Sequence, residues 1–419
     1  MAFPRRLFRP SNVVVLGLAL VMMSRVAEVA ARGKIYSLEP RRGLLQEAGV
    51  VDVTSFGAKA NDPLFDNAQA FIEAWNAACK GPGPAKLVIP PGSYITGAVV
   101  FQGPCTSSPV TVEVQGTILA LPDPSVYTNG DWFTIEMVDG IVFKGGVFDA
   151  QGQNLWQYND CKSNPDCQHL PVSIHLNKAQ NVAIDGVTSL NSMGFHVAMT
   201  FSSNITATKL NLTAPGDSPN TDGIHISTTS SVNISDSFIS TGDDCLGIIQ
   251  GASDISVTGI QCGPGHGISI GSLGKYPNEQ DVRGVHVKNC TLTGTTNGVR
   301  IKTFPGKLQL EASDIVFEDI VMNNVANPIL IDQYYGFHQK LSASRVKVHD
   351  VHFRNIRGTS ASLVAVSLAC SSLFPCEGIE LADIDLSYTG RKPLPISASC
   401  TNAKPTFSGK QNPPSCALI

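Results

Sequence analysis

Charged residues are scarce in this chain, and they are not gathered into runs. Asp, Glu, Lys and Arg make up 15% of the 419 residues, the formal net charge is -4, and no basic run or nucleic-acid motif occurs. A general attraction for nucleic acid or another polyanion is therefore excluded, so any anionic ligand must be held by local cations. The low charge and the 38 glycines favour a β-rich, turn-rich protein over a helical one.

The apolar segment near the N-terminus is too short to cross a membrane. Val13 to Met23 carries no charge, but a membrane helix needs about 20 apolar residues. The segment follows the basic stretch Arg5–Arg9 and precedes the small residues Val29-Ala30-Ala31, a pattern typical of secretory signals. We therefore predict a signal peptide over residues 1–31, a mature domain over 32–419, an extracellular location and no membrane partner.

Compact Cys/His spacing of the kind that binds zinc is absent, so no metal or other cofactor is expected. The eleven cysteines fit the oxidising exterior of the cell, where disulfides form. Their spacing suggests local pairs that leave Cys290 over, although spacing alone leaves the connectivity open. The proposed pairs are Cys79 with Cys105, Cys161 with Cys167, Cys245 with Cys262, Cys370 with Cys376, and Cys400 with Cys416.

Asn-X-Ser/Thr sequons are a further feature of secreted chains. They occur at Asn204, Asn211, Asn233 and Asn289. Such sequons accept N-linked glycans in secreted proteins, so we expect glycans on some of them.

A short phrase recurs at an interval of 22 residues in the middle of the chain. Its copies are Asp222-Gly-Ile-His-Ile226, Asp244-Cys-Leu-Gly-Ile248 and His266-Gly-Ile-Ser-Ile270, and Gly298-Val-Arg-Ile-Lys302 follows after a longer gap. Intervals of 20 to 50 residues are typical of solenoids, in which each repeat forms one coil. Equivalent positions of successive coils then stack on one face, about 4.8 Å apart.

Short apolar alternations of the strand type recur along the rest of the chain, with Gly, Asn, Asp and Ser between them. They are Ile141-Val-Phe143, Val182-Ala-Ile184, Val232-Asn-Ile234, Ile255-Ser-Val257, Val285-His-Val287, Ile315-Val-Phe317, Val346-Lys-Val348 and Ile379-Glu-Leu381. A β-sandwich also has many short strands, but it does not repeat phrases in register. We therefore predict an all-β protein formed by a single right-handed parallel β-helix without an internal domain boundary.

The two ends of the solenoid are expected to differ from its middle. Asp66 to Cys79 has apolar residues at helical spacing, with Asp66 as a possible cap. An amphipathic helix at this place can cover the open end of the core, as repeat arrays require. The tail from Lys392 onward is rich in Pro, Ser and Cys and is expected to form an irregular cover. An elongated coil buries its core without a partner, so a monomer is expected.

Stacking of the central phrases brings together side chains that are far apart in the sequence. The apolar residues of each phrase alternate and are expected to point inward, so the residues between them point outward. Crowded carboxylates raise one another's pKa, and one carboxyl can then stay protonated while another activates water. The alternative is a purely structural ladder. The expected cluster contains Asp222, Asp243, Asp244, His266, Arg300 and Lys302.

The individual residues of the cluster suggest different tasks. Asp243 or Asp244 is a candidate proton donor, but neighbouring residues of a strand point to opposite sides, so a turn or bulge at Gly242 is required. His266 lies between two glycines that allow close approach of a substrate, or else it is a hydrogen-bonded turn histidine. Arg300 can bind a carboxylate through its fork.

Lys302 adds a point charge beside that fork. The alternative for this pair of cations is an ordinary solvated charged face.

Four of these segments, in this order, resemble the motifs of the polygalacturonases of glycoside hydrolase family 28. They are Asn220-Thr-Asp222, Gly242-Asp-Asp244, Gly265-His-Gly267 and Arg300-Ile-Lys302. The resemblance extends over nearly the whole chain and includes Val53-Thr-Ser-Phe-Gly-Ala-Lys59, Val88-Ile-Pro-Pro-Gly92 and Asn327-Pro-Ile-Leu-Ile-Asp-Gln333. It implies a pectin lyase-like β-helix that hydrolyses α-1,4 linkages of polygalacturonate with inversion.

The resemblance also implies roles for the site residues. Asp243 would be the proton donor, Asp222 and Asp244 would position the water as base, and His266 would support the acid or bind substrate. Arg300 and Lys302 would hold a galacturonate carboxylate.

Further substrate contacts are implied for Asn220 and Tyr335, with Tyr334 as a competitor for the role of Tyr335. Inverting enzymes usually keep their carboxyl groups about 6.5 to 9.5 Å apart, which is more than one coil spacing.

The segment Gly271-Ser-Leu-Gly-Lys-Tyr-Pro-Asn-Glu279 resembles plant, pollen-type exopolygalacturonases, so exo action on pectin and release of galacturonate are expected, with endo action as the alternative. A calcium-dependent pectate lyase, a rhamnogalacturonan hydrolase and a non-catalytic pectin-binding protein of the cell wall are the other hypotheses. The intact ordered motifs weigh against all three. The expected partner is polygalacturonate in the cell wall.

Overall fold

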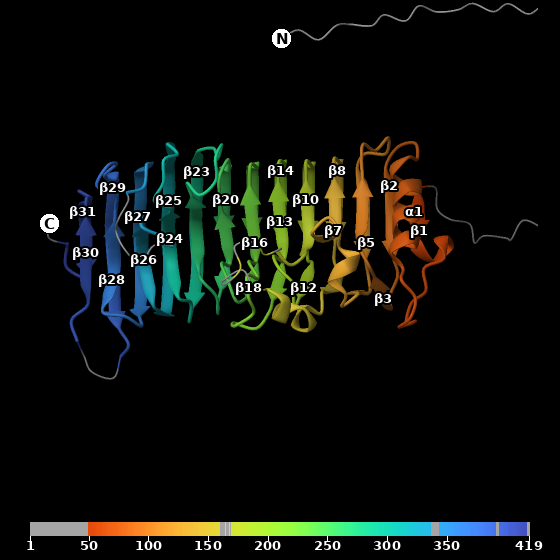
Figure 1. Cartoon of the computed structure of the whole chain (residues 1–419), viewed down its shortest axis with the longest axis horizontal. Helices are drawn as coiled ribbons and strands as arrows, with labels where there is room; N and C mark the ends of the chain where they lie inside the picture. The colour runs from red at the N-terminus through yellow and green to blue at the C-terminus, as the bar shows by residue number, and fades with distance from the viewer. Residues whose placement is uncertain are drawn as a thin grey trace, which may run out of the picture. The chain divides into compact units, whose positions relative to one another are not determined.

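The computed structural model describes residues 49–159, 164, 167, 169–336, 343–390 and 394–416. Within this part the chain winds into a right-handed parallel β-helix, and strands of successive coils lie side by side along its length (Figure 1). The predicted fold class is therefore confirmed. The predicted signal peptide and the start of the mature domain, residues 1–48, lie outside the described residues.

Two parallel sheets form the walls of the coil. The 11-stranded sheet consists of β4 (Val99–Gln102), β7 (Asp131–Glu136), β10 (Val172–Asn177), β13 (Val197–Thr200), β16 (Ile224–Ser227), β19 (Leu246–Ile248), β22 (Ile268–Leu273), β24 (Asn297–Thr303), β26 (Asn327–Asp332), β28 (Val364–Ala369) and β30 (Ser397–Thr401). The remaining strands form a 20-stranded sheet that bends around the other sides of the coil.

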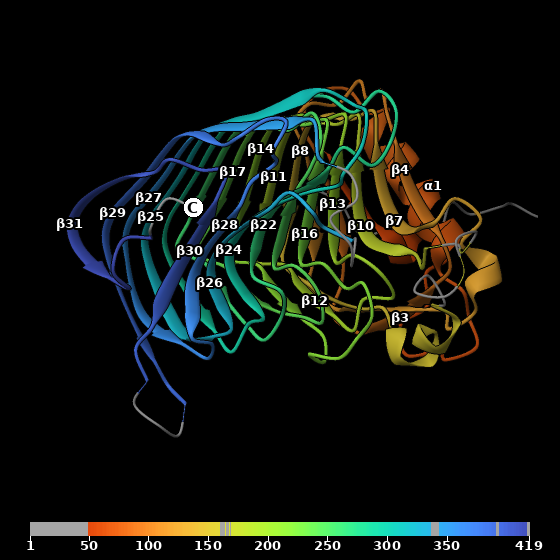
Figure 2. The ribbon, with the colours of Figure 1, turned by 60° about the vertical axis from the view of Figure 1, so that its left-hand side comes forward.

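The strands of the 20-stranded sheet are β1 (Val50–Asp52), β2 (Ala85–Ile89), β3 (Ser93–Thr96), β5 (Val110–Val114), β6 (Thr117–Ala120), β8 (Asp139–Lys144), β9 (Val147–Asp149), β11 (Gln180–Asp185), β12 (Thr188–Leu190), β14 (Ser203–Thr208), β15 (Asn211–Thr213), β17 (Ser230–Ser235), β18 (Phe238–Ser240), β20 (Ser253–Thr258), β21 (Gln261–Cys262), β23 (Val282–Thr293), β25 (Leu310–Val325), β27 (Val346–Ser360), β29 (Glu377–Tyr388) and β31 (Thr406–Asn412). The strands β23, β25, β27 and β29 are long and each replaces two short strands of the earlier coils, as the pairing of β23 with both β20 and β21 shows (Figure 2).

The register of the 11-stranded sheet follows the repeated phrases of the sequence. Ile224 lies opposite Leu246, Leu246 opposite Ile268, and Ile268 opposite Val299. All four side chains are fully buried inside the coil. The interval of 22 residues is therefore one coil, and the longer gap before Val299 is accommodated outside the strands.

One predicted alternation is out of register. Ile315 lies opposite Val351, so the equivalent phrase is Val351-His-Phe353 and not Val346-Lys-Val348. Val346 instead lies opposite Leu310, nearer the start of the same long strands. The 15-residue strand β27 alternates along its whole length, so the local pattern alone does not fix which pair of residues is equivalent.

The N-terminal end of the coil is covered by α1 (Ala68–Cys79), as predicted (Figure 1). Trp75 stacks on Phe101 of β4 at a centroid distance of 4.6 Å. The helix begins two residues later than predicted, and its N-cap position is Asn67. Asp66 nevertheless satisfies the first helical N–H, because its Oδ1 accepts a 2.9 Å hydrogen bond from Ala68.

Short 3-10 helices occur at Val53–Phe56, Pro124–Val126, Gly152–Asn154 and Trp156–Tyr158. Across the described part of the chain, α1 and these turns are all too short or too polar to span a membrane.

The predicted irregular cover at the C-terminus is wrong. β30 pairs with β28 and β31 pairs with β29, so residues 397–412 add a further coil (Figure 1). Proline and serine at the start of this segment hide its strand character in the sequence.

Disulfides join Cys79 to Cys105, Cys245 to Cys262, Cys370 to Cys376 and Cys400 to Cys416, as predicted. Cys290 is a buried free thiol, also as predicted. The predicted Cys161–Cys167 pair involves Cys161, which lies outside the described residues.

His196 is a fully buried imidazole whose Nε2 has no hydrogen-bond partner among the described residues. Burial lowers its pKa to about 3, although a hydrogen bond to the Ser189 backbone opposes the change. The folded protein therefore keeps His196 neutral, whereas the unfolded chain protonates it below its ordinary pKa of about 6.5.

The difference between the pKa of His196 in the folded and in the unfolded protein predicts that the free energy of unfolding falls in acid. The stabilising contribution is complete above about pH 6.5 and is lost as the pH falls towards 3. His196→Gln should remove on the order of 3 kcal/mol from the difference in unfolding free energy between pH 7 and pH 4. Denaturant unfolding at the two pH values measures it, with the exposed His286→Gln as control. An unchanged difference in His196→Gln would contradict the prediction.

Candidate active site

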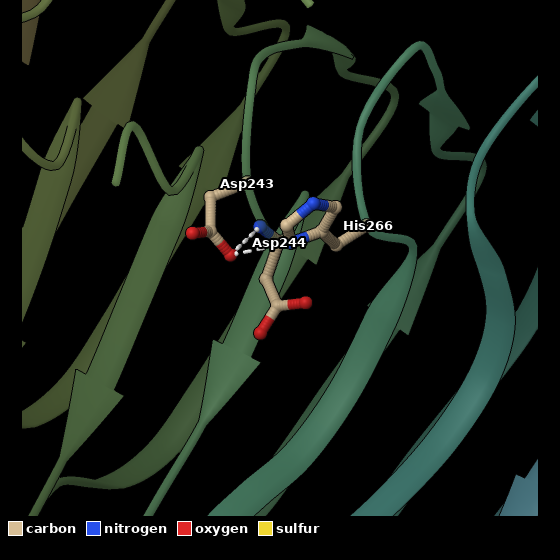
Figure 3. Close-up of side chains that lie close together, drawn as sticks. All are labelled: Asp243, Asp244 and His266. Atoms are coloured by element: carbon tan, nitrogen blue, oxygen red, sulfur yellow. Dashed lines mark hydrogen bonds and ion pairs between the residues drawn. The ribbon is translucent and has the colours of Figure 1, made fainter. Parts of the chain in front are cut away.

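The predicted polar cluster forms on the outer side of the 11-stranded sheet. Asp222 and Asp244 precede β16 and β19 by two residues each, and His266 precedes β22 in the same way. Figure 3 shows that the side chains of Asp243, Asp244 and His266 converge from two successive coils. Single oxygen or nitrogen atoms of these three side chains lie within 4.8 Å of one another.

The backbone bends at Gly242 and Asp243, as the sequence requires if both aspartates are to face outward. A Cβ at Gly242 would lie 1.9 Å from the carbonyl oxygen of Ser218, so no other residue fits without a shift of the backbone. The bend leaves Asp243 outside the strand register. Its carboxylate and that of Asp244 therefore lie on the same side of the sheet (Figure 3).

The glycines on either side of His266 have a packing role. A Cβ at Gly265 would lie 2.8 Å from the carbonyl oxygen of Asp243, and one at Gly267 would lie 2.1 Å from that of Asn297. Both glycines also have positive φ. They let neighbouring coils approach each other, whereas the sequence had suggested approach of a substrate.

Asp244 is the buried centre of the cluster, with 2% of its surface exposed. Its Oδ1 accepts hydrogen bonds from Arg300 at 2.6 Å and from the Ser269 hydroxyl at 2.8 Å. Its Oδ2 accepts one from the Lys302 ammonium at 2.7 Å. Both cations are themselves buried, so Asp244 and these two side chains form a compact charged group.

Asp243 is more exposed and is paired with His266. Its Oδ1 accepts hydrogen bonds from the backbone N–H of Asp244 at 2.8 Å and from Nδ1 of His266 at 2.9 Å. Burial acts to raise the pKa of Asp243, but the hydrogen bond and charge of His266, together with the charge of Lys302, hold it below its ordinary value. The hydrogen bond to Asp243 raises the pKa of His266 in return.

Asp222 is nearly buried, and its environment is less favourable for a charge. Burial raises its pKa to about 6, and the negative charge of Asp243 adds to the increase. The opposing contribution comes from His225, whose Nδ1 lies 3.0 Å from Oδ2. One carboxyl of the cluster thus has a raised pKa, mainly through burial and only secondly through the predicted crowding, and that carboxyl is Asp222 and not the expected proton donor, Asp243.

A cavity of about 530 Å³ opens above the cluster. Asp222, Asp243, Asp244 and Lys302 line it. So do Asn220 and Tyr335, the two further residues that the sequence had suggested for substrate contact.

Tyr335 lies with its ring centroid 5.2 Å from the Lys302 ammonium. Its competitor Tyr334 instead has its hydroxyl 3.3 Å from the carbonyl oxygen of Cys370. Arg300 is not part of the cavity wall. It lies beside Asp244, to which it donates a hydrogen bond.

Three residues of the site were not singled out from the sequence. Ser269 donates to Asp244 and accepts from Nε of Arg300. His225 holds Asp222 and stacks on Phe195, with ring centroids 4.2 Å apart. Ser269 and His225 occupy outward positions of the repeated phrases, so the alternation offered a signal for both, whereas nothing in the sequence pointed to Phe195.

The oxygen and nitrogen atoms of Asp243, Asp244 and His266 are close enough together for a metal ion. However, both oxygens of Asp244 already accept hydrogen bonds from cationic side chains, and Oδ1 of Asp243 accepts from His266. The positive charge that a metal would supply is thus supplied by the chain itself. The donor set does not fit a resident divalent ion.

Activity should accordingly survive removal of divalent ions. We expect the rate on polygalacturonate, the substrate that the family resemblance implies, to be unchanged within about twofold after dialysis against EDTA, measured as released reducing ends. Added calcium should not increase it. Loss of activity that calcium restores would contradict this account and would favour a calcium-dependent lyase.

Comparisons with known proteins agree with the geometry. The model of the family described as "Glycosyl hydrolases family 28" matches residues 79–415. An exopolygalacturonase of Platanus acerifolia is 43% identical over 89% of this chain and 99% of its own length. One from Oenothera organensis is 45% identical over 84% of this chain and 98% of its own length.

Among solved structures, a hyperthermoactive exopolygalacturonase of Thermotoga maritima has the same fold, with a TM-score of 0.72 at 19% identity. The match covers 86% of this chain and 91% of that one.

Proposed function

Because this chain belongs to family 28 of the glycosyl hydrolases, we propose that it hydrolyses the α-1,4 linkages of polygalacturonate from the chain end and releases galacturonate. The observation that carries the proposal is the composition of the cavity. Ionisable carboxyls, Asp222 and Asp243, face the same space as the Lys302 ammonium. The cavity therefore has carboxyls that can act on a glycosidic bond and an ammonium that can bind the carboxylate of a uronate.

The Asp243–His266 pair supplies the proton in this proposal. In the free protein the pKa of Asp243 is lowered and that of His266 is raised, so we assign the shared proton to His266. Its transfer from Nδ1 to the carboxylate of Asp243 gives the acid that protonates the glycosidic oxygen as the bond to the anomeric carbon breaks.

The same transfer removes the negative charge that helps to raise the pKa of Asp222. Asp222 then ionises more easily and can accept a proton from the attacking water.

The remaining groups position the reactants. Asp244, held by Arg300 and Lys302, provides a second carboxylate oxygen for the water. The Lys302 ammonium and Tyr335, which both line the cavity, would contact the sugar carboxylate and ring, and Asn220 would contact its hydroxyls. Arg300 acts through Asp244, which it fixes by a hydrogen bond.

Inversion at the anomeric carbon is part of the proposal, although the carboxyls are close together. Oxygens of Asp243 and Asp244 lie within 4.8 Å of each other. The usual separation in inverting enzymes is about 6.5 to 9.5 Å. The proposed base, Asp222, comes from the preceding coil and lines the same cavity as Asp243, and the water would bind between these two side chains.

The proposed activity is tested by a product time course on de-esterified polygalacturonate, with released sugars separated by size and viscosity recorded in parallel. We expect galacturonate alone, with slow loss of viscosity. Mixed oligomers with a rapid fall in viscosity would indicate endo action. Unsaturated products would indicate a lyase, and the absence of any product would indicate a protein that only binds pectin.

We further propose that the protein is secreted, glycosylated and active as a monomer in the cell wall. Its disulfides suit an oxidising compartment. The sequon asparagines Asn204, Asn211, Asn233 and Asn289 are all exposed on strands of the 20-stranded sheet. Glycans there would leave the cavity over the 11-stranded sheet open. A mass decrease after enzymatic deglycosylation and light scattering of the purified protein test these points.

A further inference from the structure

A second cavity, of about 700 Å³, lies beside the active-site cavity and shares part of its wall. Lys275, Tyr276, Pro277 and Phe304 line both cavities, and the second one continues along residues 305–308. We propose that this second cavity binds the third galacturonate unit of the substrate, beyond the two units that flank the cleaved bond in the active-site cavity, with Lys275 and Lys307 recognising its carboxylate. This inference rests on the proposed function and extends it to a neighbouring binding position.

The cations of the second cavity are available to a ligand. Lys275 and Lys307 are exposed, and within the described ranges neither forms an ion pair. Lys302, by contrast, is bound to Asp244. In a chain with a net charge of -4, unpaired ammonium groups beside a cavity provide the local positive potential that an anionic sugar requires.

The loop that carries Lys275 is held in place by Glu279. Its carboxylate accepts hydrogen bonds from the backbone N–H groups of Gly274 at 2.5 Å, Lys275 at 3.0 Å and Tyr276 at 2.7 Å. The carboxylate of Glu279 is therefore bound to backbone N–H groups. The Lys275 ammonium rests instead 5.0 Å from the ring centroid of Tyr276, at the boundary of the two cavities.

The shared wall is also fixed from the other side. The ring of Phe304 packs edge-to-face on Tyr335, with centroids 5.2 Å apart. A Cβ at Gly336 would lie 2.7 Å from Cε1 of Phe304, so the ring and the backbone are in close contact. Phe304 and Tyr276 therefore offer preformed apolar surface for the face of a sugar ring.

Lys307 gives the sharpest test, because it lines the second cavity but not the active-site cavity. In Lys307→Ala, the ratio of the KM for trigalacturonate to that for digalacturonate should rise about tenfold, as expected for losing one hydrogen bond to a charged group. Lys307→Arg should restore the ratio. The matched control is Lys209→Ala, which removes an exposed lysine that lines neither cavity.

An unchanged ratio in Lys307→Ala, or an equal effect on both substrates, would overturn the inference. Calorimetric binding of the two oligomers in an Asp243→Asn background separates this inference from the proposed function. Tighter binding of the trimer that depends on Lys307, in a chain whose parent does not hydrolyse it, would refute the function and keep the binding position. Hydrolysis of the trimer, together with trimer binding that does not depend on Lys307, would support the function and refute the binding position.

Discussion

Replacing Asp243 with asparagine is expected to lower kcat on polygalacturonate by about 100- to 10,000-fold, the usual contribution of a general acid. The amide oxygen can still accept the hydrogen bonds that Asp243 now accepts from Asp244 and His266. The coil should therefore stay folded, with an unchanged far-ultraviolet spectrum and melting temperature. The measurement is kcat from initial rates of reducing-end release.

The same substitution has a second expected effect that does not depend on activity. It removes the negative charge that helps to raise the pKa of Asp222, so this carboxyl should titrate below its present value of about 6. Carbon NMR of labelled aspartate measures it. Asp254→Asn, which changes an exposed aspartate of β20, is the control. Full activity in Asp243→Asn would refute the assignment of the acid.

Arg300→Ala is the second substitution with a large expected effect. The guanidinium is buried and bonded to Asp244 and Ser269, so its loss leaves Asp244 with Lys302 as its one cationic partner among the described residues. We expect the free energy of unfolding to fall by about 2 to 3 kcal/mol, below the 3 to 5 kcal/mol found when a buried ion pair loses its only partner. We also expect kcat/KM to fall about 100-fold.

The division of that loss between kcat and KM tests the role of Arg300. If the side chain acts by positioning Asp244, kcat falls more than KM rises. If it holds the substrate carboxylate, as the family resemblance suggested, KM rises while kcat changes little. Arg354→Ala, which breaks a partly exposed pair with Glu380 far from the cluster in sequence, is the control and should alter neither constant.

The coil and the members of the site were predictable from the sequence because they depend on spacing. An identical interval between Asp222, Asp244 and His266 puts them in register whatever the turns do. Spacing failed where the pattern was too regular, as in β27, where two alternations five residues apart compete for one register. It also failed where strand residues lie among prolines and serines, as in β30 and β31.

The contacts within the site could not be predicted from the sequence, because they depend on how deeply each side chain is buried. The outward direction of Arg300 was predictable, but its burial and its hydrogen bond to Asp244 depend on how neighbouring coils pack. The raised pKa of Asp222 has the same origin, since burial contributes more to it than the charge of Asp243 does. The second cavity brings together Lys275, Phe304 and Lys307, which no repeat relates.

The most direct test of the account is proton NMR of the first product released from polygalacturonate, recorded before mutarotation. Attack of water from the face opposite the leaving group predicts monomeric galacturonate that appears first as the β-anomer. Galacturonate that appears first as the α-anomer would contradict the roles given to Asp222 and Asp243. Oligomers as the first products would contradict exo action, and an unsaturated sugar would contradict hydrolysis itself.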